Sequence, residues 1–192
     1  MNRTKKAICE VFWQLLEEKP YNKITVQDIV NRCQVNRNTF YYHFQDIPAL
    51  TEYSIKAFSE DIIEKNYYFE SPVDCILPLA QELITRKRAF IHIYHSACGE
   101  TLIQYFNKVC YDIVASYVNN TPQNVNVSEE DKKFYIHYHK CIWAGIILDW
   151  ISSGASYDLL EFCRKVCHSF EGFGNIAFFK LVMDQYAPTT MQ

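Results

Sequence analysis

The stretch from Thr25 to Phe44 constrains this chain more than any other segment, because it holds two helix starts only a few residues apart. Its first half, 25–33, places apolar residues on one helix face. It begins at Thr25, which forms a slightly shortened capping box with Asp28. Asn36 is a second helix start, and an aromatic run ending at Phe44 follows it. Only two residues separate the two segments, so the sequence predicts a helix-turn-helix unit.

The second of these helices carries an unusually polar set of side chains next to its aromatic ones. Nearly all of the polar residues can donate hydrogen bonds to phosphates or base edges: Arg37, Asn38, Thr39, Tyr41, Tyr42 and His43. Phe40 and Phe44 fall on the opposite side of the helix, where we expect them in the core. An ordinary helical hairpin with a polar face would show the same pattern, so the pattern alone leaves both interpretations open.

Composition favours a helical protein. Hydrophobic residues make up 49% of the 192 residues, whereas Gly (5) and Pro (6) are scarce. The chain has no uncharged apolar run of about 18 residues, the length that would cross a membrane. Its N-terminal residues also lack the apolar stretch of a signal peptide. We therefore expect a cytoplasmic protein that does not insert into a membrane.

Charge is unevenly distributed. Residues 1–50 hold seven Lys and Arg against five Asp and Glu, although the whole chain has a net charge of −3. A slightly basic end on an acidic body is typical of a protein whose tip meets phosphates.

The eight cysteines show no CxxC pair, and in a cytosolic chain such cysteines are usually reduced core residues. A redox-sensing role for one of them is the alternative. Two sets have helical spacing that could suit a metal: His92 with His95, and Cys163 with Cys167 and His168. Neither set has a clear further ligand nearby to complete a metal site, so we expect no metal and no cofactor. We find no nucleophile–base set, phosphate loop or HExxH pattern, so the sequence does not indicate an enzyme.

The whole chain reads as all-α, with a small three-helix N-terminal unit joined through a long helix to a larger helical domain. The long helix, starting after an Asp46 cap, makes the domains share a rigid element, and we place the boundary between 1–60 and 61–192. The remaining helices are expected at 4–18, 47–67, 72–86, 88–98, 101–119, 128–153, 157–170 and 176–185. Gly99 is expected to break the chain between two of them, and Ser128 to cap the longest.

The segment 24–50, ITVQDIVNRCQVNRNTFYYHFQDIPAL, resembles the N-terminal domain of TetR-family transcriptional regulators. The matching pattern is T-V-x-D-I, a Val at the turn, T-F-Y-Y-H-F, and a Leu in the following helix. The resemblance implies a homodimer that binds a palindromic double-stranded DNA operator, and a C-terminal domain that binds an unknown small-molecule effector. Such a protein is more often a repressor than an activator. A transcriptional activator and a cysteine-based redox regulator remain the alternatives.

The resemblance also implies roles for individual residues. Thr25 and Asn36 match positions that contact phosphates near helix starts, and Arg37, Asn38 and Tyr41 match positions that approach bases. Phosphate contacts are implied for a further set: Thr39, Tyr42 and His43. The chain departs from the pattern in two places. Gln34 stands at a turn position where Gly is usual, and Ile47 replaces a Lys at the start of the fourth helix.

The larger domain has candidate pocket and dimer residues, although an ordinary core would look similar. The pocket candidates combine an aromatic or imidazole ring with a polar group in most cases: Phe58, His92, Tyr94, His95, Tyr105, Tyr111 and Tyr138. The dimer candidates are large apolar residues of the last two long helices: Trp143, Ile147, Trp150, Phe162 and Val166.

Overall fold

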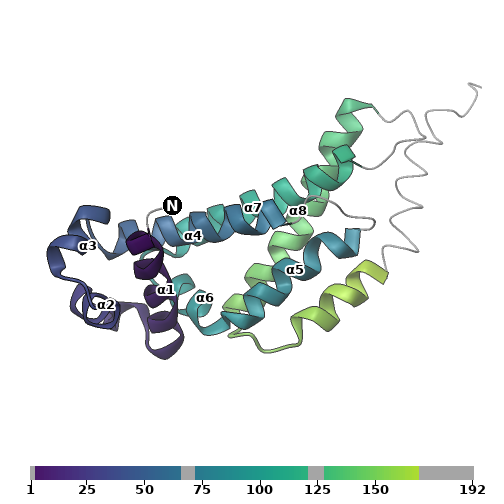
Figure 1. Cartoon of the computed structure of the whole chain (residues 1–192). Coiled ribbons are helices and arrows are strands. Elements are labelled where there is room, and N and C mark those ends of the chain that lie inside the picture. The colour runs from purple at the N-terminus through teal and green to yellow at the C-terminus, as the bar shows by residue number, and fades with distance from the viewer. Residues whose placement is uncertain (1–2, 66–71, 121–127, 169–192) are drawn as a thin grey trace, which may run out of the picture.

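A computed structural model describes residues 3–65, 72–120 and 128–168, and these residues form an elongated helical molecule (Figure 1). The first four α-helices and a short 3-10 turn come from the N-terminal part: α1 (Arg3–Glu18), η1 (Tyr21–Lys23), α2 (Val26–Cys33), α3 (Arg37–His43) and α4 (Ile47–Lys65). The rest comprises α5 (Pro72–Thr85), α6 (Lys87–Tyr94), α7 (Gly99–Asn120), α8 (Glu129–Ser152) and a helix that is described over 159–168. The predicted all-α class is confirmed.

The head of the molecule, at the left of Figure 1, is built by α1, α2 and α3. One face of α1 is fully buried, with Ile8, Phe12 and Leu16 at its centre. The helix packs against both α2 and α6. Pro20 lies two residues after the end of α1 and prevents the helix from continuing, so the chain turns through η1 into α2.

The long helix α4 leaves the head and runs alongside α7, as Figure 1 shows. Asp46 accepts a hydrogen bond from the backbone N–H of Ala49 at 2.8 Å, which confirms it as the cap of α4. Because α4 starts only a few residues after α3 ends, it couples the head rigidly to the larger part. The structure describes α4 as far as Lys65, and the end that the sequence predicted, near residue 67, lies outside the described residues.

Two helix boundaries in the body differ from the sequence prediction. The helix expected over 88–98 ends at Tyr94, and Gly99 is the first residue of α7 instead of an interruption before it. A side chain at Gly99 would collide with the carbonyl oxygen of Tyr94, so only glycine allows so sharp a turn between α6 and α7. Ser128 caps α8 as expected, accepting a hydrogen bond from the N–H of Asp131 at 3.1 Å. The helix expected over 176–185 lies outside the described residues.

The longest described helices, α7 and α8, pack along each other and form a hairpin that extends away from the head (Figure 1). Trp143, Ile147 and Trp150 of α8 are buried between the helices of the body. Among the helices that the structure describes, none is long and apolar enough to cross a membrane.

Candidate nucleic-acid interface

The start of α2 is fixed by a reciprocal pair of hydrogen bonds. The backbone N–H of Asp28 donates to the Thr25 hydroxyl at 3.2 Å, and the backbone N–H of Thr25 donates to the Asp28 carboxylate at 2.8 Å. The ammonium of Lys19 lies 2.9 Å from the same carboxylate. Hydrogen bonds from Thr25 and Lys19 lower the pKa of Asp28 to about 2, so this carboxylate keeps its charge at all physiological pH values.

In the turn between α2 and α3, Gln34 occupies the position where the family pattern usually has glycine. Gln34 has φ 55° and ψ 40°, in the left-handed region that glycine enters more easily. The backbone N–H of Val35 donates to the carbonyl of Val30 at 3.0 Å, which closes the end of α2. Gln34 therefore makes the tight turn without glycine, at the expense of local backbone strain.

A second cap fixes the start of α3. The side-chain oxygen of Asn36 accepts hydrogen bonds from the backbone N–H of Thr39 at 2.8 Å and from its hydroxyl at 3.0 Å. At the inner side of the helix Phe40 and Phe44 are buried, as the sequence predicted, and their rings contact each other. The cap and the two phenylalanines set the rotation of α3 about its axis, so they decide which side chains face outward.

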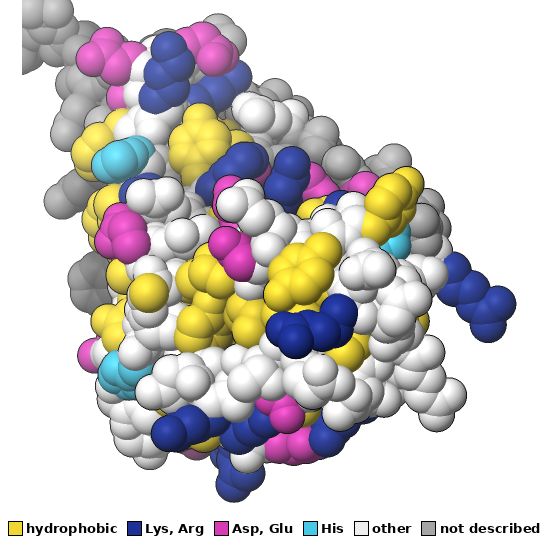
Figure 2. Space-filling view, turned by 90° about the vertical axis from the view of Figure 1, so that its left-hand side faces the viewer, with side chains coloured by type: hydrophobic (Ala, Val, Ile, Leu, Met, Phe, Trp, Pro, Cys, Tyr) yellow, Lys and Arg dark blue, Asp and Glu magenta, His cyan; other side chains and the backbone are white. Residues whose placement is uncertain are grey.

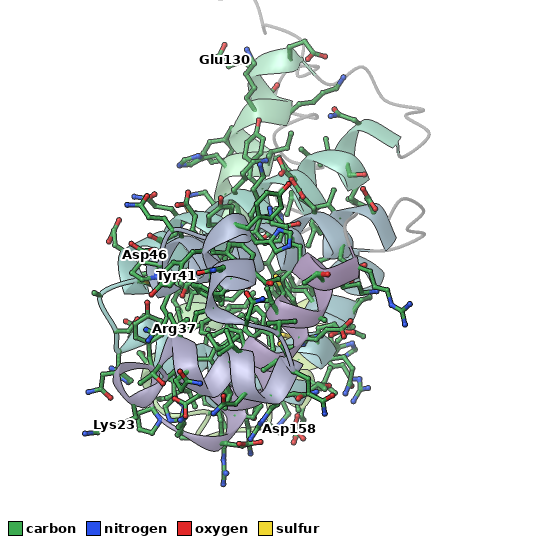
Figure 3. The ribbon with its side chains drawn as sticks, turned by 60° about the vertical axis from the view of Figure 1, so that its left-hand side comes forward. Lys23, Arg37, Tyr41, Asp46, Glu130 and Asp158 are labelled. Atoms are coloured by element: carbon green, nitrogen blue, oxygen red, sulfur yellow. The ribbon has the colours of Figure 1, made fainter. Side chains whose placement is uncertain are left out.

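The outward side of α3 collects the polar residues that the sequence singled out. Arg37, Asn38, Tyr41 and Tyr42 are exposed, and Tyr42 has 82% of its surface free. Figure 3 shows Arg37 and Tyr41 near one another at the end of the molecule that faces the viewer. The helix thus presents a guanidinium, an amide and two phenols on one surface. These groups can reach base edges and phosphates when a helix enters a major groove.

Of the other predicted contact residues, Thr25 and Asn36 are exposed, whereas Thr39 and His43 are half-buried. Thr25, Asn36 and Thr39 use side-chain atoms in the caps described above. All eight therefore lie on α3 or at the starts of α2 and α3, with three of them also holding those starts in place. The view of this end in Figure 2 shows Lys and Arg side chains spread around a mixed polar and hydrophobic surface.

Lys5 has a role that the sequence reasoning missed. Its ammonium lies 3.7 Å from the ring centroid of Tyr53 and 5.2 Å from that of Phe44, so α1 is held against the junction of α3 and α4. Arg32 pairs with both carboxylate oxygens of Glu18, at 2.7 and 2.8 Å, and joins α2 to α1. Neither pairing could be found from spacing, because the partners of each lie more than ten residues apart in the sequence.

Comparison with known proteins agrees with this geometry. Residues 8–53 match the family model described as bacterial regulatory proteins of the tetR family, and residues 70–172 match a transcriptional regulator C-terminal region, TetR_C_8. The chain belongs to the TetR family. It is therefore a DNA-binding transcriptional regulator, and members of this family are not enzymes.

Two curated relatives are similar over most of this chain. The uncharacterized HTH-type transcriptional regulator YxbF of Bacillus subtilis (strain 168) is 22% identical over 82% of this chain, which spans 42% of YxbF. The HTH-type dhaKLM operon transcriptional activator DhaS of Lactococcus lactis is 25% identical over 82% of this chain and 84% of DhaS.

Solved structures show the same fold. The structure of the dihydroxyacetone kinase operon activator DhaS aligns over 92% of this chain and 98% of that chain, with a TM-score of 0.79 and 18% identity. NalD, the secondary repressor of the MexAB-OprM multidrug efflux pump in Pseudomonas aeruginosa, aligns over 88% of this chain and 97% of that chain. Its TM-score is 0.55 and its identity 16%.

The structure places the predicted pocket residues of this TetR-family chain in different surroundings within the part of the chain that it describes. Phe58 is buried against the rings of Trp13 and Phe90, and Nδ1 of His92 forms a hydrogen bond with the carbonyl of Leu16 at 2.7 Å. The remaining candidates are scattered: Tyr94 is half-buried, His95, Tyr111 and Tyr138 are exposed, and Tyr105 lines a cleft between α4 and α7.

A small apolar cavity lies between α5, α7 and α8, with Tyr135, His139 and Trp143 in its wall. Its volume of about 10 Å³ is at most that of one water molecule. Burial lowers the pKa of His139 to about 4, so its imidazole is neutral at pH 7.

The predicted dimer residues fall into two groups, one buried and one at least partly exposed. Trp143, Ile147 and Trp150 are buried in the core of this one chain, so they offer a partner no free surface. The indole N–H of Trp150 donates to the carbonyl of Tyr157 at 2.9 Å, which fixes the chain after α8. Phe162 is 42% exposed and Val166 is half-buried.

Most cysteines that the structure describes are poor candidates for redox sensing. Burial raises the pKa of Cys9 and Cys33, and to about 12 for Cys110 and Cys163, so little reactive thiolate forms at pH 7. Cys141 of α8 is exposed. Among the described residues, no group of three or more His, Cys, Asp and Glu side chains could hold a metal ion.

Proposed function

We propose that this protein is a homodimeric regulator that binds a palindromic operator through α3 and releases it when a small molecule binds the C-terminal domain. The observation that carries the proposal is the rotation of α3, which buries Phe40 and turns Arg37, Asn38 and Tyr41 outward. Arg37 is the base-reading residue, because its guanidinium can pair with O6 and N7 of guanine. We assign the head to residues 1–60 and the body to 61–192, with α4 shared between them, and a cytoplasmic location follows from the DNA target.

A stripe along α8 supports dimerisation. Phe134, Tyr138, Cys141 and Gly145 are all exposed and follow one another at intervals of three or four residues, so they share one helix face. The rings of Phe134 and Tyr138 stack at 6.1 Å. Exposed aromatic rings beside a glycine are typical of a helix–helix interface, where the glycine allows two backbones to approach closely. This α8 stripe replaces Trp143, Ile147 and Trp150 as the proposed contact with the partner.

The oligomeric state tests this surface directly. We expect size-exclusion chromatography with light scattering to show a dimer for the wild-type protein and a monomer for Gly145→Glu. A side chain at Gly145 meets nothing within 4 Å in its own chain, so a monomer would fold normally. Gln81→Glu adds the same charge at an exposed position of α5 and should stay dimeric. A wild-type monomer at micromolar concentration would contradict the proposed dimer.

Contacts between α1 and α6 give the body a physical connection to the head. The carboxylate of Glu17 accepts a hydrogen bond from the backbone N–H of Ala89 at 3.0 Å, near the positive end of α6. His92 bonds to the carbonyl of Leu16, and the Arg86 guanidinium lies 5.3 Å from the ring centroid of Trp13. A shift of α6 would therefore pull on α1, and with it on the spacing of two α3 helices in a dimer.

Repression is the proposed direction of control, because a bound dimer can exclude polymerase from a promoter without any further contact. Activation is the second candidate, and the similarity to DhaS favours it, since DhaS is named as an activator of its operon. A transcription reaction on a template carrying the binding site separates the two. Less transcript on addition of the protein supports repression, and more transcript supports activation.

Selection from a pool of random double-stranded DNA tests the proposed function as a whole. We expect the wild-type protein to enrich a palindrome whose half-sites lie about one helical turn apart, near 34–36 Å, or a multiple of it. Enrichment of no sequence, or of a site without two-fold symmetry, would contradict the proposal.

A further inference from the structure

A cleft of about 460 Å³ lies between α4 and α7, where the helix that leaves the head packs against the body. The volume falls in the range of about 300–1,000 Å³ that is usual for small-molecule sites. Its wall is more polar than a typical hydrophobic pocket. Glu52, Lys56 and Glu60 come from α4, and Thr101, Tyr105 and Lys108 come from α7.

Both lysines of this cleft lie beside a carboxylate, whereas one of its glutamates has no cationic partner among the described residues. The Lys108 ammonium is paired with Asp112 at 2.6 Å, and Lys56 lies 3.8 Å from Glu60 on the same helix. Glu52 is exposed, and within the described part of the chain its carboxylate has no ion-pair or hydrogen-bond partner. With both lysines already beside a carboxylate, the group left to a ligand is the anion of Glu52.

The pKa of the Tyr105 hydroxyl indicates which charges act most strongly inside the cleft. Its pKa is raised by burial first, then by the negative charges of Glu52 and Glu60, against a smaller opposing effect of Lys108. The two carboxylates therefore act on the Tyr105 hydroxyl more strongly than the nearest ammonium does. Within the described residues this hydroxyl also has no hydrogen-bond partner, so its oxygen is free to accept one.

We propose that the α4–α7 cleft binds a small organic cation carrying an ammonium group. The ammonium donates hydrogen bonds to the Glu52 carboxylate and to the Tyr105 hydroxyl oxygen. An ammonium has only donors, which suits a site whose free groups are acceptors. A carboxylate or phosphate ligand would instead face the unpaired charge of Glu52.

The position of the cleft gives such a ligand control over the head, and this part of the inference rests on the proposed function. The α4 helix begins at Ile47, directly after the turn that follows α3. A cation held between α4 and α7 changes the distance or angle between these helices, so it moves α3 relative to the body. In a dimer this movement alters the spacing of the two α3 helices, and DNA affinity changes with it.

Three probes with the same four-carbon chain separate charge from size. We expect 1,4-diaminobutane to raise the thermal unfolding midpoint of the full-length protein with increasing concentration, at matched ionic strength. The neutral 1,4-butanediol should raise it less, and succinate should not raise it. Titration calorimetry then gives the dissociation constants, without DNA in the cell.

Two variants and a control locate the binding. Glu52→Gln keeps the shape of the side chain and should weaken diamine binding at least about tenfold, as expected for loss of a charged hydrogen bond. Tyr105→Phe should weaken it several-fold. Glu64→Gln removes one exposed carboxylate of α4 outside the cleft and should leave the affinity unchanged. Equal loss in Glu64→Gln and Glu52→Gln, tighter binding of succinate, or no binding of any probe would overturn the proposal.

DNA binding is measured separately, by fluorescence anisotropy on the DNA that the protein selects. Diamine binding without an effect on DNA affinity would refute control through this cleft, while the cation site itself would stand. Failure of the protein to bind DNA would refute the proposed function, and the calorimetric result would still decide whether the cleft binds the cation.

Discussion

Helices α3 and α8 both carry runs of aromatic and imidazole side chains, yet the two runs are used in opposite ways. In α3, Phe40 is fully buried whereas Tyr41 and Tyr42 are exposed. In α8, apolar residues lie on every face, so Trp143 is buried in the core while Phe134 is 60% exposed. A short helix with a polar side has one possible orientation, but a helix that is apolar all round can turn either of two faces to the core. The comparison shows why the exposed side of α3 was easier to predict from the sequence than the exposed side of α8.

The largest expected effect comes from a substitution on the buried face of α8, which we compare with a substitution on its exposed face. We expect Trp143→Ala to reduce the free energy of unfolding by about 3–5 kcal/mol, because it leaves a cavity in the core. Phe134→Ala should change it by less than about 0.5 kcal/mol in the monomer, and should weaken the dimer instead. Urea unfolding at low protein concentration and sedimentation analysis measure the two effects. A large loss of stability from Phe134→Ala alone would mean that the faces have been assigned the wrong way round.

A pH titration tests the same difference between the two faces of α8. His139 is buried, whereas its neighbour Tyr138 is exposed. The folded pKa of His139, about 4, lies below the ordinary value of 6.5, so the unfolded chain binds more protons between these values. The contribution of His139 to stability is therefore complete above pH 6.5 and is lost as the pH falls toward 4, by up to about 3 kcal/mol.

The matched variant for this titration is His139→Phe. Carboxylates titrate in the same acidic range, so the quantity to follow is the difference in unfolding free energy between wild type and variant. This difference should change between pH 6.5 and 4 and stay constant above pH 7. A difference that is independent of pH would show that His139 is not buried in the neutral form.

In α3, the exposed Tyr42 should affect binding and leave the fold intact. We expect Tyr42→Ala to weaken binding to every DNA sequence several-fold, about 1 kcal/mol, because a phosphate contact carries no sequence information. The dependence of the affinity on salt should stay the same, because the neutral phenol of Tyr42 displaces no counterion from the DNA. Anisotropy with selected and unrelated DNA at several salt concentrations checks this. An effect on the selected DNA alone would assign Tyr42 to base reading.

The smallest effect concerns the turns that end α2 and α8, which both contain a non-glycine residue in the left-handed region. Gln34 has φ 55° and Ala155 has φ 59°. Gln34→Gly and Ala155→Gly should each stabilise the protein by less than about 1 kcal/mol, since relief of strain is partly offset by the greater freedom of glycine in the unfolded chain. Thermal unfolding measures the change. A clear loss of stability in both variants would show that the backbone is not strained there.

The features that could be predicted from the sequence depend on residues that lie close together in the chain. The caps at Thr25, Asn36, Asp46 and Ser128 depend on residues three positions away, and the structure confirms each of them. The cleft between α4 and α7 depends instead on segments about fifty residues apart, whose packing no local pattern encodes. Tyr105 was singled out for a pocket from its chemistry, but Glu52 was not, because an exposed carboxylate on a helix looks like any solvated residue.

The central claim is that α3 reads DNA through Arg37, and the affinity of Arg37→Ala for the selected DNA tests it most directly. Arg37 is exposed, so the variant should unfold at the same temperature as the wild type. We expect it to lose about 1–3 kcal/mol of affinity for the selected site and to discriminate less at one base pair of each half-site. Arg88→Ala, which removes an exposed guanidinium from α6, should bind as the wild type does. Unchanged affinity and unchanged sequence preference in Arg37→Ala would contradict the account.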